Sequence, residues 1–175
     1  MGTVLIVIGA VVLAALAAYF LSYNRLVNDR NTVASSWATV DTELKRRHEL
    51  IPPLVEAVKG TATHEQALLV RAAEAHATAM AGNHSPTAAG RNEPAVATAA
   101  ADLVALRERY PQLNSQQNFL DLQRRLTTTE DRIAAARRYY NTVVAKLNRR
   151  VEAFPSNVVA NRAGIGPAEY FELEA

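Results

Sequence analysis

A run without any charged residue occupies the start of the chain, from Gly2 to Asn24. Its central part, TVLIVIGAVVLAALAAYFLS, is rich in Val, Leu and Ile. At about 1.5 Å of rise per residue, a helix of this length spans about 30 Å, the thickness of the hydrocarbon core of a bilayer. Each large aliphatic side chain favours insertion by roughly 0.3 to 0.6 kcal/mol. We therefore expect one transmembrane helix from about Thr3 to Ser22.

A cleaved signal peptide is the alternative interpretation of this segment. Ala15-Leu16-Ala17 provides the small-x-small pattern at which a signal peptidase cuts. However, no Lys or Arg precedes the apolar run, and the run continues past this pattern through Tyr19 to Leu21. Both features favour a retained membrane anchor over a cleaved leader.

The charges that follow the apolar run predict the orientation of the anchor. Basic residues begin only at Arg25 and return at Arg30 and Lys45-Arg46-Arg47. Because Lys and Arg are retained on the cytoplasmic side, we expect the N-terminus outside, the C-terminal domain in the cytoplasm, and the chain in the inner membrane of the cell. Aromatic rings favour the membrane interface. Those expected at the inner interface are Tyr19, Phe20 and Tyr23.

Beyond the anchor, the sequence predicts helices and no strands. Hydrophobic residues make up 49% of the chain but aromatic residues only 6%, and Ala, the best helix former, is abundant. The expected fold class is all-α, with an N-terminal transmembrane helix followed by an antiparallel bundle of three to four long helices. The expected divisions are the transmembrane anchor at 1–22, the helical bundle domain at 23–155, and a C-terminal tail at 156–175 that packs on the bundle.

Proline and glycine predict where the helices of the bundle end. Pro52-Pro53 lack amide hydrogens and disfavour a helical conformation before them, so a first helix over 23–51 is expected to reverse there. A second helix is expected over 54–80, with a restart near the capping pattern Thr63-x-x-Gln66. The Gly-, Pro- and Asn-rich stretch 82–94 is typical of a surface loop. Pro94 suits the first position of a third helix over 94–110.

The fourth expected helix, over 114–153, carries the most regular pattern in the chain. Apolar residues recur at alternating spacings of three and four, with Thr129 at one of these positions. Such a stripe predicts a seam packed against neighbouring helices. It consists of Phe119, Leu122, Leu126, Ile133, Ala136, Tyr140, Val143, Leu147, Val151 and Phe154. The corresponding stripe of the first helix consists of Val33, Trp37, Val40, Leu44 and Ile51.

Histidines are the residues most suited to hold a metal, because the chain has no Cys. None of His48, His64, His76 and His84 begins an H-E-x-x-H motif, and no Glu stands three residues before any of them. Nucleophile elbows, P-loops and dinucleotide-binding glycine motifs do not occur. We expect a protein that is not an enzyme, without catalytic residues, metal or cofactor. A hydrolase or metalloenzyme is the minor alternative.

The charge run Lys45-Arg46-Arg47-His48 has three interpretations. It is most simply a solvated helix face, but it could also pair with acidic groups of the fourth helix. Contact with anionic lipid is disfavoured, since about 25 residues separate the run from the anchor. The basic and aromatic stretch Arg137-Arg138-Tyr139-Tyr140 does not indicate nucleic acid binding, because the net charge is only +2 and Tyr140 belongs to the apolar stripe.

Three stretches of the sequence resemble one family. They are YNRLVNDRNTVASSWATVDTELKRRHELIPPLVEAVKGTATHE, YPQLNSQQNFLDLQRRLTTTEDRIAAARRYYNTVVAKLNRRVEAFPSNVVA and the closing AEYFELE. In order and spacing they are similar to the LemA family of bacterial membrane proteins. The resemblance implies one membrane span with a cytoplasmic helical bundle, no established enzymatic activity, and an association with membrane proteases of the HtpX type. Ala163 and Ile165 stand where aromatics are frequent in the family, which weakens the expected packing of the tail.

Together these features predict a membrane-anchored, non-catalytic interaction or scaffold protein of the LemA type, accessory to the quality control of membrane proteins. Its expected partners are the lipid bilayer and a protein, with an HtpX-type protease implied by the resemblance. A self-associating protein that organises membrane is the alternative, although Gly9 and Leu13 form no G-x-x-x-G motif. Polar residues that packing does not explain either contact a partner or form a buried network between the first and fourth helices. They are Asp41, Arg46, Arg47, Asn118, Glu130 and Arg132.

Overall fold

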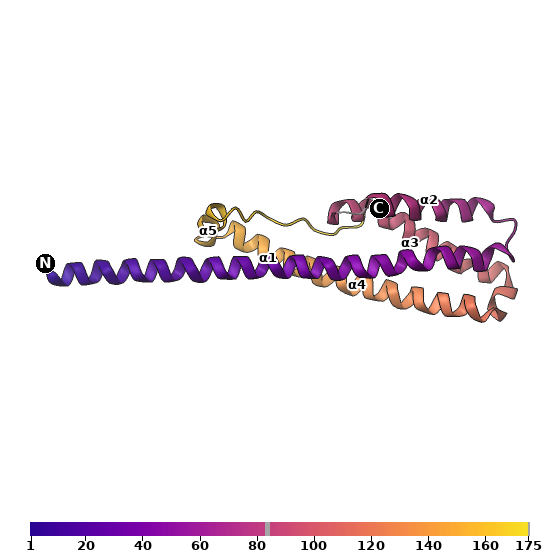
Figure 1. Cartoon of the computed structure of the whole chain (residues 1–175), viewed down its shortest axis with the longest axis horizontal. Coiled ribbons are helices and arrows are strands. Elements are labelled where there is room, and N and C mark those ends of the chain that lie inside the picture. The colour runs from indigo at the N-terminus through magenta and orange to yellow at the C-terminus, as the bar shows by residue number, and fades with distance from the viewer. Residues whose placement is uncertain (83–84, 175) are drawn as a thin grey trace. The chain divides into compact units, whose positions relative to one another are not determined.

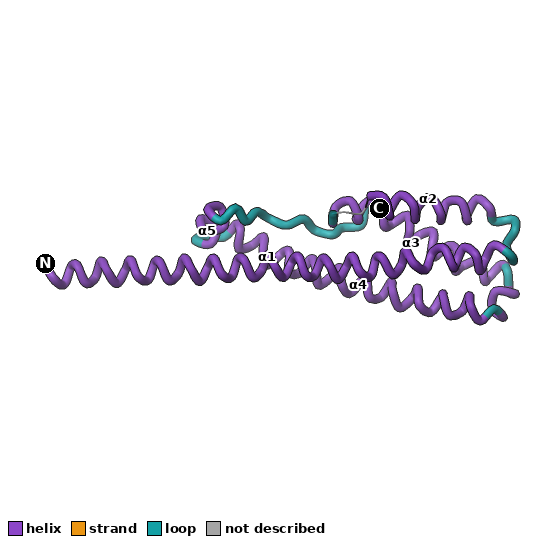
Figure 2. The backbone as a smooth tube through the Cα atoms, in the orientation of Figure 1, coloured by secondary structure: helices purple, strands orange, loops and turns teal. Residues whose placement is uncertain are grey.

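The computed structural model describes residues 1–82 and 85–174, and helices make up nearly all of this part of the chain (Figure 2). Within these residues, five α-helices and one 3-10 helix follow one another along the sequence, and the α-helices are labelled in Figure 1. They are α1 (Gly2–Lys59), α2 (Gln66–Gly82), α3 (Pro86–Arg109), η1 (Pro111–Ser115), α4 (Gln117–Glu152) and α5 (Ser156–Arg162). No strand forms among the described residues, which confirms the all-α prediction.

The chain divides into two compact units, to which α1 and α4 both contribute. The first, here the N-terminal unit, contains residues 1–36 and 141–168. The second, here the bundle unit, contains residues 37–140 and 169–175. The predicted division at residue 22 rests on partition into a membrane, and that at residue 155 on the end of the apolar stripe at Phe154-Pro155; both stay predictions.

The apolar start of α1 is exposed along its whole length. Every residue from 1 to 18 is exposed, and large side chains such as Ile6 and Leu13 keep about 70% of their surface free. A helix that is apolar all round needs an apolar environment on every side. Among the described residues, α1 is the one helix long and apolar enough to cross a membrane, which is consistent with a single membrane anchor.

Farther along, the N-terminal unit is held by a buried aspartate and an asparagine. Asp29 of α1 is only 3% exposed. It forms one ion pair with Lys146 at 3.0 Å and a second, shorter one with Arg150, and both partners lie on α4. The side-chain amide of Asn148 both donates to and accepts from the backbone of Ala168, at 3.0 and 2.8 Å. The ion pairs of Asp29 hold α1 against α4. The hydrogen bonds of Asn148 attach the chain after α5 to α4.

The bundle unit encloses one continuous apolar core. α2 and α3 lie side by side, and the core draws on α1, α2, α3, η1 and α4. Its largest fully buried side chains include Ile51, Leu54, Leu103, Leu113 and Phe119. The regular stripe of α4 is buried as expected from Phe119 to Leu147, apart from a half-buried Ala136, whereas Phe154 lies beyond the helix end and is exposed.

The double proline does not reverse the chain, so that prediction was wrong. α1 continues through Pro52 and Pro53 to Lys59. Both prolines face solvent, whereas the adjacent Ile51 and Leu54 are buried. Each proline costs a helix roughly 3 kcal/mol, but burial of each large aliphatic side chain in this stripe returns about 1.5 to 3 kcal/mol. Burial of several such residues therefore outweighs the missing hydrogen bonds.

The reversal lies in residues 60–65 instead. The amide of Ala62 still donates to the carbonyl of Val58 at 2.9 Å, which closes the last turn after α1. α2 then begins at Gln66, within the Thr63-x-x-Gln66 pattern and not at residue 54. The carbonyl of Glu65 accepts from the amides of Leu68 and Leu69, so Glu65 starts the new helix.

The predicted loop over 82–94 is mostly helix, which is the second correction. Ser85 caps α3, because its hydroxyl accepts a hydrogen bond from the Ala88 amide at 3.2 Å. Pro86 follows at the first helical position, where its missing N–H costs nothing. Pro94, expected to start the helix, lies inside it. The predicted loop residues 83 and 84, His84 among them, lie outside the described residues.

The end of the chain packs on the bundle unit through one aromatic side chain and a backbone contact. Phe171 is fully buried, with its ring 5.7 Å from that of Trp37. The Tyr140 hydroxyl donates to the Glu169 carbonyl at 2.7 Å. The Glu174 amide donates to the carbonyl of Gly90 at 3.0 Å. The tail is therefore a strap that lies against α3 and α4.

Gly90→Ala tests this strap. A Cβ at residue 90 would lie 2.1 Å from the carbonyl oxygen of Glu172, so the strap must shift. We expect a loss of about 1 to 3 kcal/mol in the free energy of unfolding, measured in urea, and faster proteolysis of the last residues. Gly166→Ala is the matched control, because nothing lies within 4 Å of its added methyl. Equal stability of the two variants would contradict the packing described here.

Candidate functional site

A fully buried carboxylate lies at the centre of the bundle unit. Glu93 of α3 has no exposed surface, and a charge in such a place requires compensating partners. Arg47 of α1 forms an ion pair with its Oε2 through Nη2. His48, the next residue of α1, places its Nε2 2.9 Å from the Oε1 of Glu93. Both oxygens of the carboxylate are therefore occupied by groups of one neighbouring helix.

Arg47 extends the cluster to a third helix. Its side chain is only 3% exposed, and its Nη1 donates to both carboxylate oxygens of Glu130 on α4, at 3.1 Å each. Its Nη2 also lies 3.4 Å from the backbone carbonyl of Glu93. The planar guanidinium suits this fork-shaped contact. We call Arg47, His48, Glu93 and Glu130 the ion-pair cluster; it connects α1, α3 and α4.

The balance of charge in the cluster keeps Glu93 ionised. Burial alone would raise the pKa of its carboxyl, but the hydrogen bond from His48 and the charge of Arg47 together outweigh burial and hold the pKa below its ordinary value. Because ionised Glu93 only accepts, the Nε2 of His48 carries the proton. The other ring nitrogen of His48, Nδ1, is buried without a hydrogen-bond partner among the described residues. The His76 ring lies edge-on to His48 at 5.2 Å, and burial lowers the pKa of His76.

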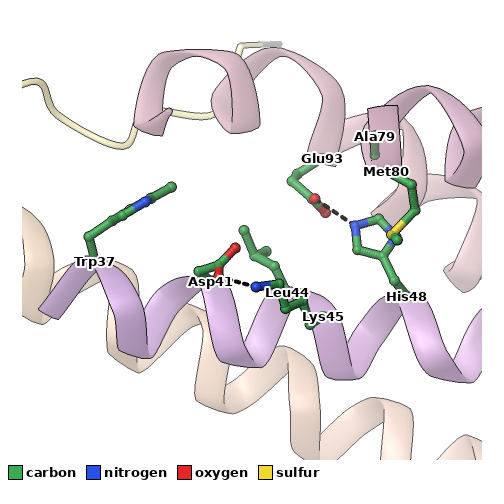
Figure 3. Close-up of a pocket in the computed structure, with 8 residues that line it drawn as sticks. All are labelled: Trp37, Asp41, Leu44, Lys45, His48, Ala79, Met80 and Glu93. Carbon is green, nitrogen blue, oxygen red and sulfur yellow. Dashed lines mark hydrogen bonds and ion pairs between the residues drawn. The ribbon is translucent and has the colours of Figure 1, made fainter. Parts of the chain in front are cut away.

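A cavity of about 350 Å³ lies beside the cluster. In Figure 3 the side chains of α1 rise from below, and Glu93 and Met80 face them from the opposite side. Trp37, Leu44 and Met80 form an apolar wall. The charged groups of the lining are paired, since Lys45 donates to Asp41 at 2.6 Å and Glu93 accepts from the Nε2 of His48.

The paired groups of the cluster are suited to hold helices together. Glu93 uses both oxygens, and the proton of His48 is committed to it. Within the described residues, no group of three or more His, Cys, Asp or Glu side chains is placed to hold a metal ion.

The six polar residues singled out from the sequence lie in different places. Arg47 and Glu130 are bonded to one another. Asp41 lines the cavity, and Arg46 is half-exposed and bonded to Glu43 at 2.7 Å. Asn118, in the first turn of α4, and Arg132, farther along it, are both exposed. Arg46 and Arg132 line one surface groove of about 440 Å³.

Sequence reasoning missed Glu93 and the role of His48. Glu93 lay inside the stretch that was interpreted as a loop. A signal was nevertheless present, because Ala89, Glu93, Val96 and Ala100 follow spacings of four, three and four, as a buried helical stripe does. Extending the helix back to Ser85-Pro86, a capping residue followed by a first-turn proline, would have placed this carboxylate on the inward face.

Fold and site together define a helical-bundle protein that carries a long apolar N-terminal helix and ties its interior with ion pairs. The chain belongs to the LemA family, whose family model matches residues 36–175. The matched region contains the whole ion-pair cluster and begins after the apolar segment.

Two curated relatives are similar to part of the chain. They are the magnetosome proteins MamQ 1 and MamQ 2 of Paramagnetospirillum magneticum (strain ATCC 700264 / AMB-1), each 34% identical over 70 residues. The similarity covers 40% of this chain and 26% of each relative. The chain thus spans about a quarter of the length of these relatives.

Replacing Glu93 tests whether the cluster stabilises the bundle. Glu93→Gln keeps the size of the side chain and leaves Arg47 buried with less compensating charge. We expect the free energy of unfolding in urea to fall by about 3 to 5 kcal/mol at neutral pH. Because the folded pKa of Glu93 is below its ordinary 4.5, the contribution of its charge is complete above pH 4.5 and is lost as the pH falls through the folded pKa. The stability difference between wild type and variant therefore narrows below pH 4.5.

Glu49→Gln is the matched control for that experiment. Glu49 is an exposed carboxylate on α1, two residues after Arg47, and its loss should change the free energy of unfolding by no more than about 0.5 kcal/mol. A wild-type-to-Glu93→Gln difference that stays constant down to about pH 3 would show that the charge of Glu93 is not what stabilises the fold.

Proposed function

We propose that this member of the LemA family is a membrane-anchored, non-catalytic interaction protein whose helical bundle presents its surface to a protein partner. The observation that carries the proposal is the pairing within the ion-pair cluster. Arg47 pairs with both Glu93 and Glu130, whereas the outer faces of α1 and α4 carry exposed charges. Charges that pair with one another support a structural role for the bundle, whereas exposed charges support recognition of a partner protein.

The exposed apolar segment of α1 supports attachment to a bilayer. We infer an orientation with the N-terminus outside and the bundle in the cytoplasm, at the inner membrane, because the chain carries its basic residues after the apolar run. Tyr19, Phe20 and Tyr23 are then the aromatic residues of the inner interface. The rings of Tyr19 and Phe20 contact each other at 5.9 Å.

Single cysteines test this orientation on an otherwise cysteine-free chain. Gly2→Cys and Asn161→Cys are both exposed positions. In intact cells that produce the full chain, a membrane-impermeant maleimide should label Gly2→Cys at once and Asn161→Cys only after lysis. The reverse pattern would place the bundle outside the cell. Labelling of neither position before lysis would contradict the anchor.

The partner we propose is a protein of the same membrane, and a membrane protease of the HtpX type is the first candidate, in a role accessory to membrane protein quality control. The proposal involves no cofactor and no nucleic acid. The relatives named as magnetosome proteins share only a 70-residue segment with the chain. We therefore propose no magnetosome role for this protein.

Photocrosslinking in native membranes tests the interaction. A photoreactive amino acid at exposed Asn118 or Asp131 of the full chain is expected to yield a crosslinked product with a different protein. The same amino acid at Trp37, on the half-buried side of α1, is the control and should crosslink within the chain. A product of twice the mass of the chain would instead favour the self-associating alternative. Uncrosslinked chain alone at both exposed positions would contradict the interaction role.

A further inference from the structure

An exposed groove with four arginines lies on the bundle unit, outside the ion-pair cluster. Arg46 of α1 and Arg124, Arg125 and Arg132 of α4 line it, together with Thr128 and Thr129. Its volume is about 440 Å³. We call this surface the basic groove. Glu49 is its single acidic residue, so four positive charges face one negative charge.

Two of these guanidinium groups have no partner within the described part of the chain. No side-chain hydrogen bond or ion pair forms at Arg125 or Arg132, and both are exposed. The other two have only neighbours on their own helices: Arg46 contacts Glu43 at 2.7 Å and Arg124 contacts Asp121 at 2.9 Å. Exposed pairs of this kind contribute at most about 1 kcal/mol, so they exchange readily for a better ligand.

The positive charges are spread in a row rather than gathered at one point. Arg125 and Arg132 are seven residues apart on α4, which corresponds to about 10 Å along a helix. The hydroxyls of Thr128 and Thr129 donate to backbone carbonyls of their own helix, at 2.9 and 2.8 Å. They therefore do not converge with the arginines on a single anion. A row of cations matches a ligand that carries several carboxylates along its length.

We propose that the basic groove binds an acidic peptide segment of a partner protein, with Arg125 and Arg132 as its main contacts. The inference rests on the proposed function and names the chemistry of the partner. Charge complementarity carries it: uncommitted guanidinium groups recognise carboxylates by forked hydrogen bonds, and clustered exposed charge of one sign accelerates encounter with a partner of the other sign.

Other anionic ligands fit the groove less well. Single-stranded nucleic acid binding uses aromatic side chains on which bases stack, and the groove lining contains none. A single phosphate is best held by donors that point at one centre, whereas these arginines are spaced along the helix. Anionic lipid is a further possible occupant of any arginine-rich surface, and the experiment below separates it from peptide.

The test measures binding of a fluorescent decaglutamate peptide to the full chain in phosphatidylcholine nanodiscs, by anisotropy. We expect binding that weakens as salt rises, because salt screens exposed charges. Arg125→Glu together with Arg132→Glu should weaken binding at least about tenfold. The milder pair Arg125→Gln and Arg132→Gln should weaken it about threefold or more. Far-UV circular dichroism and urea unfolding verify that each variant is folded.

A second charge reversal provides the matched control. Arg71→Glu with Arg162→Glu makes the same change in net charge at exposed positions outside the groove. It should alter decaglutamate binding less than about threefold, since general electrostatic attraction alone is long-ranged and weak in salt. Equal weakening by the two reversals would overturn the groove as the binding site.

Two competitors separate the possible occupants. Inorganic phosphate that displaces the peptide at concentrations too low to screen charge would mark a phosphate site, and would overturn the proposal. Loss of peptide binding when phosphatidylglycerol is added to the nanodiscs would show that lipid occupies the groove, and would also overturn it. A groove-dependent dimer of this chain that excludes the peptide would assign the groove to a second copy and overturn it as well.

The outcomes also distinguish this inference from the proposed function. If the groove variants bind decaglutamate as well as the wild type does, while the chain still crosslinks to another protein, the interaction role stands. Only the assignment of the groove as the binding site is then overturned. Groove-dependent peptide binding with no crosslink to any protein in native membranes would retain the chemistry of the groove and remove the interaction role.

Discussion

The ion pair between Arg47 and Glu93 is the contact on which the bundle unit depends. Neither charge has access to water, so each would destabilise the fold if it lacked the other. Glu130 and His48 complete the pairing, and three helices that are far apart in sequence are thereby fixed in one arrangement. A purely apolar seam would tolerate sliding by a turn, whereas a buried arginine that must meet two carboxylates permits a single register. We infer that the cluster adds specificity of packing, and that loss of either partner would also cost stability.

The sequence was sufficient to predict the features that repeat. The uncharged run predicted an apolar helix, and the spacing of three and four from Phe119 to Leu147 predicted the buried seam of α4. The sequence was insufficient where a local preference, such as that of proline to end a helix, opposed burial against residues distant in the chain. Pro52-Pro53 stops most helices, but here the apolar residues around the pair are buried in a core. That core is completed by residues of α2, α3, η1 and α4, which lie later in the chain.

The site was harder to predict because its members come from separate helices. Arg47 and Glu130 were singled out, and they pair across a separation of 83 residues. Glu93 is 46 residues from Arg47 and was hidden by a composition that resembled a loop. Pro86 begins α3, and Gly90 allows a close contact. Gly90 in particular permits the strap to approach α3 within a distance that any Cβ would block.

The strap and the ion-pair cluster respond oppositely to proton concentration. The Tyr140 hydroxyl that donates to the strap is buried near the charge of Glu169, which raises its pKa to about 12 from 10.0. A raised pKa in the folded state means that this phenol stays protonated, and keeps its full stabilising effect, up to about pH 10 and loses it only toward pH 12. The carboxylate of Glu93 instead loses its charge, and with it its stabilising effect, at acidic pH. The bundle unit therefore keeps both contributions in full from about pH 4.5 to about pH 10, and it loses a different contact beyond each limit.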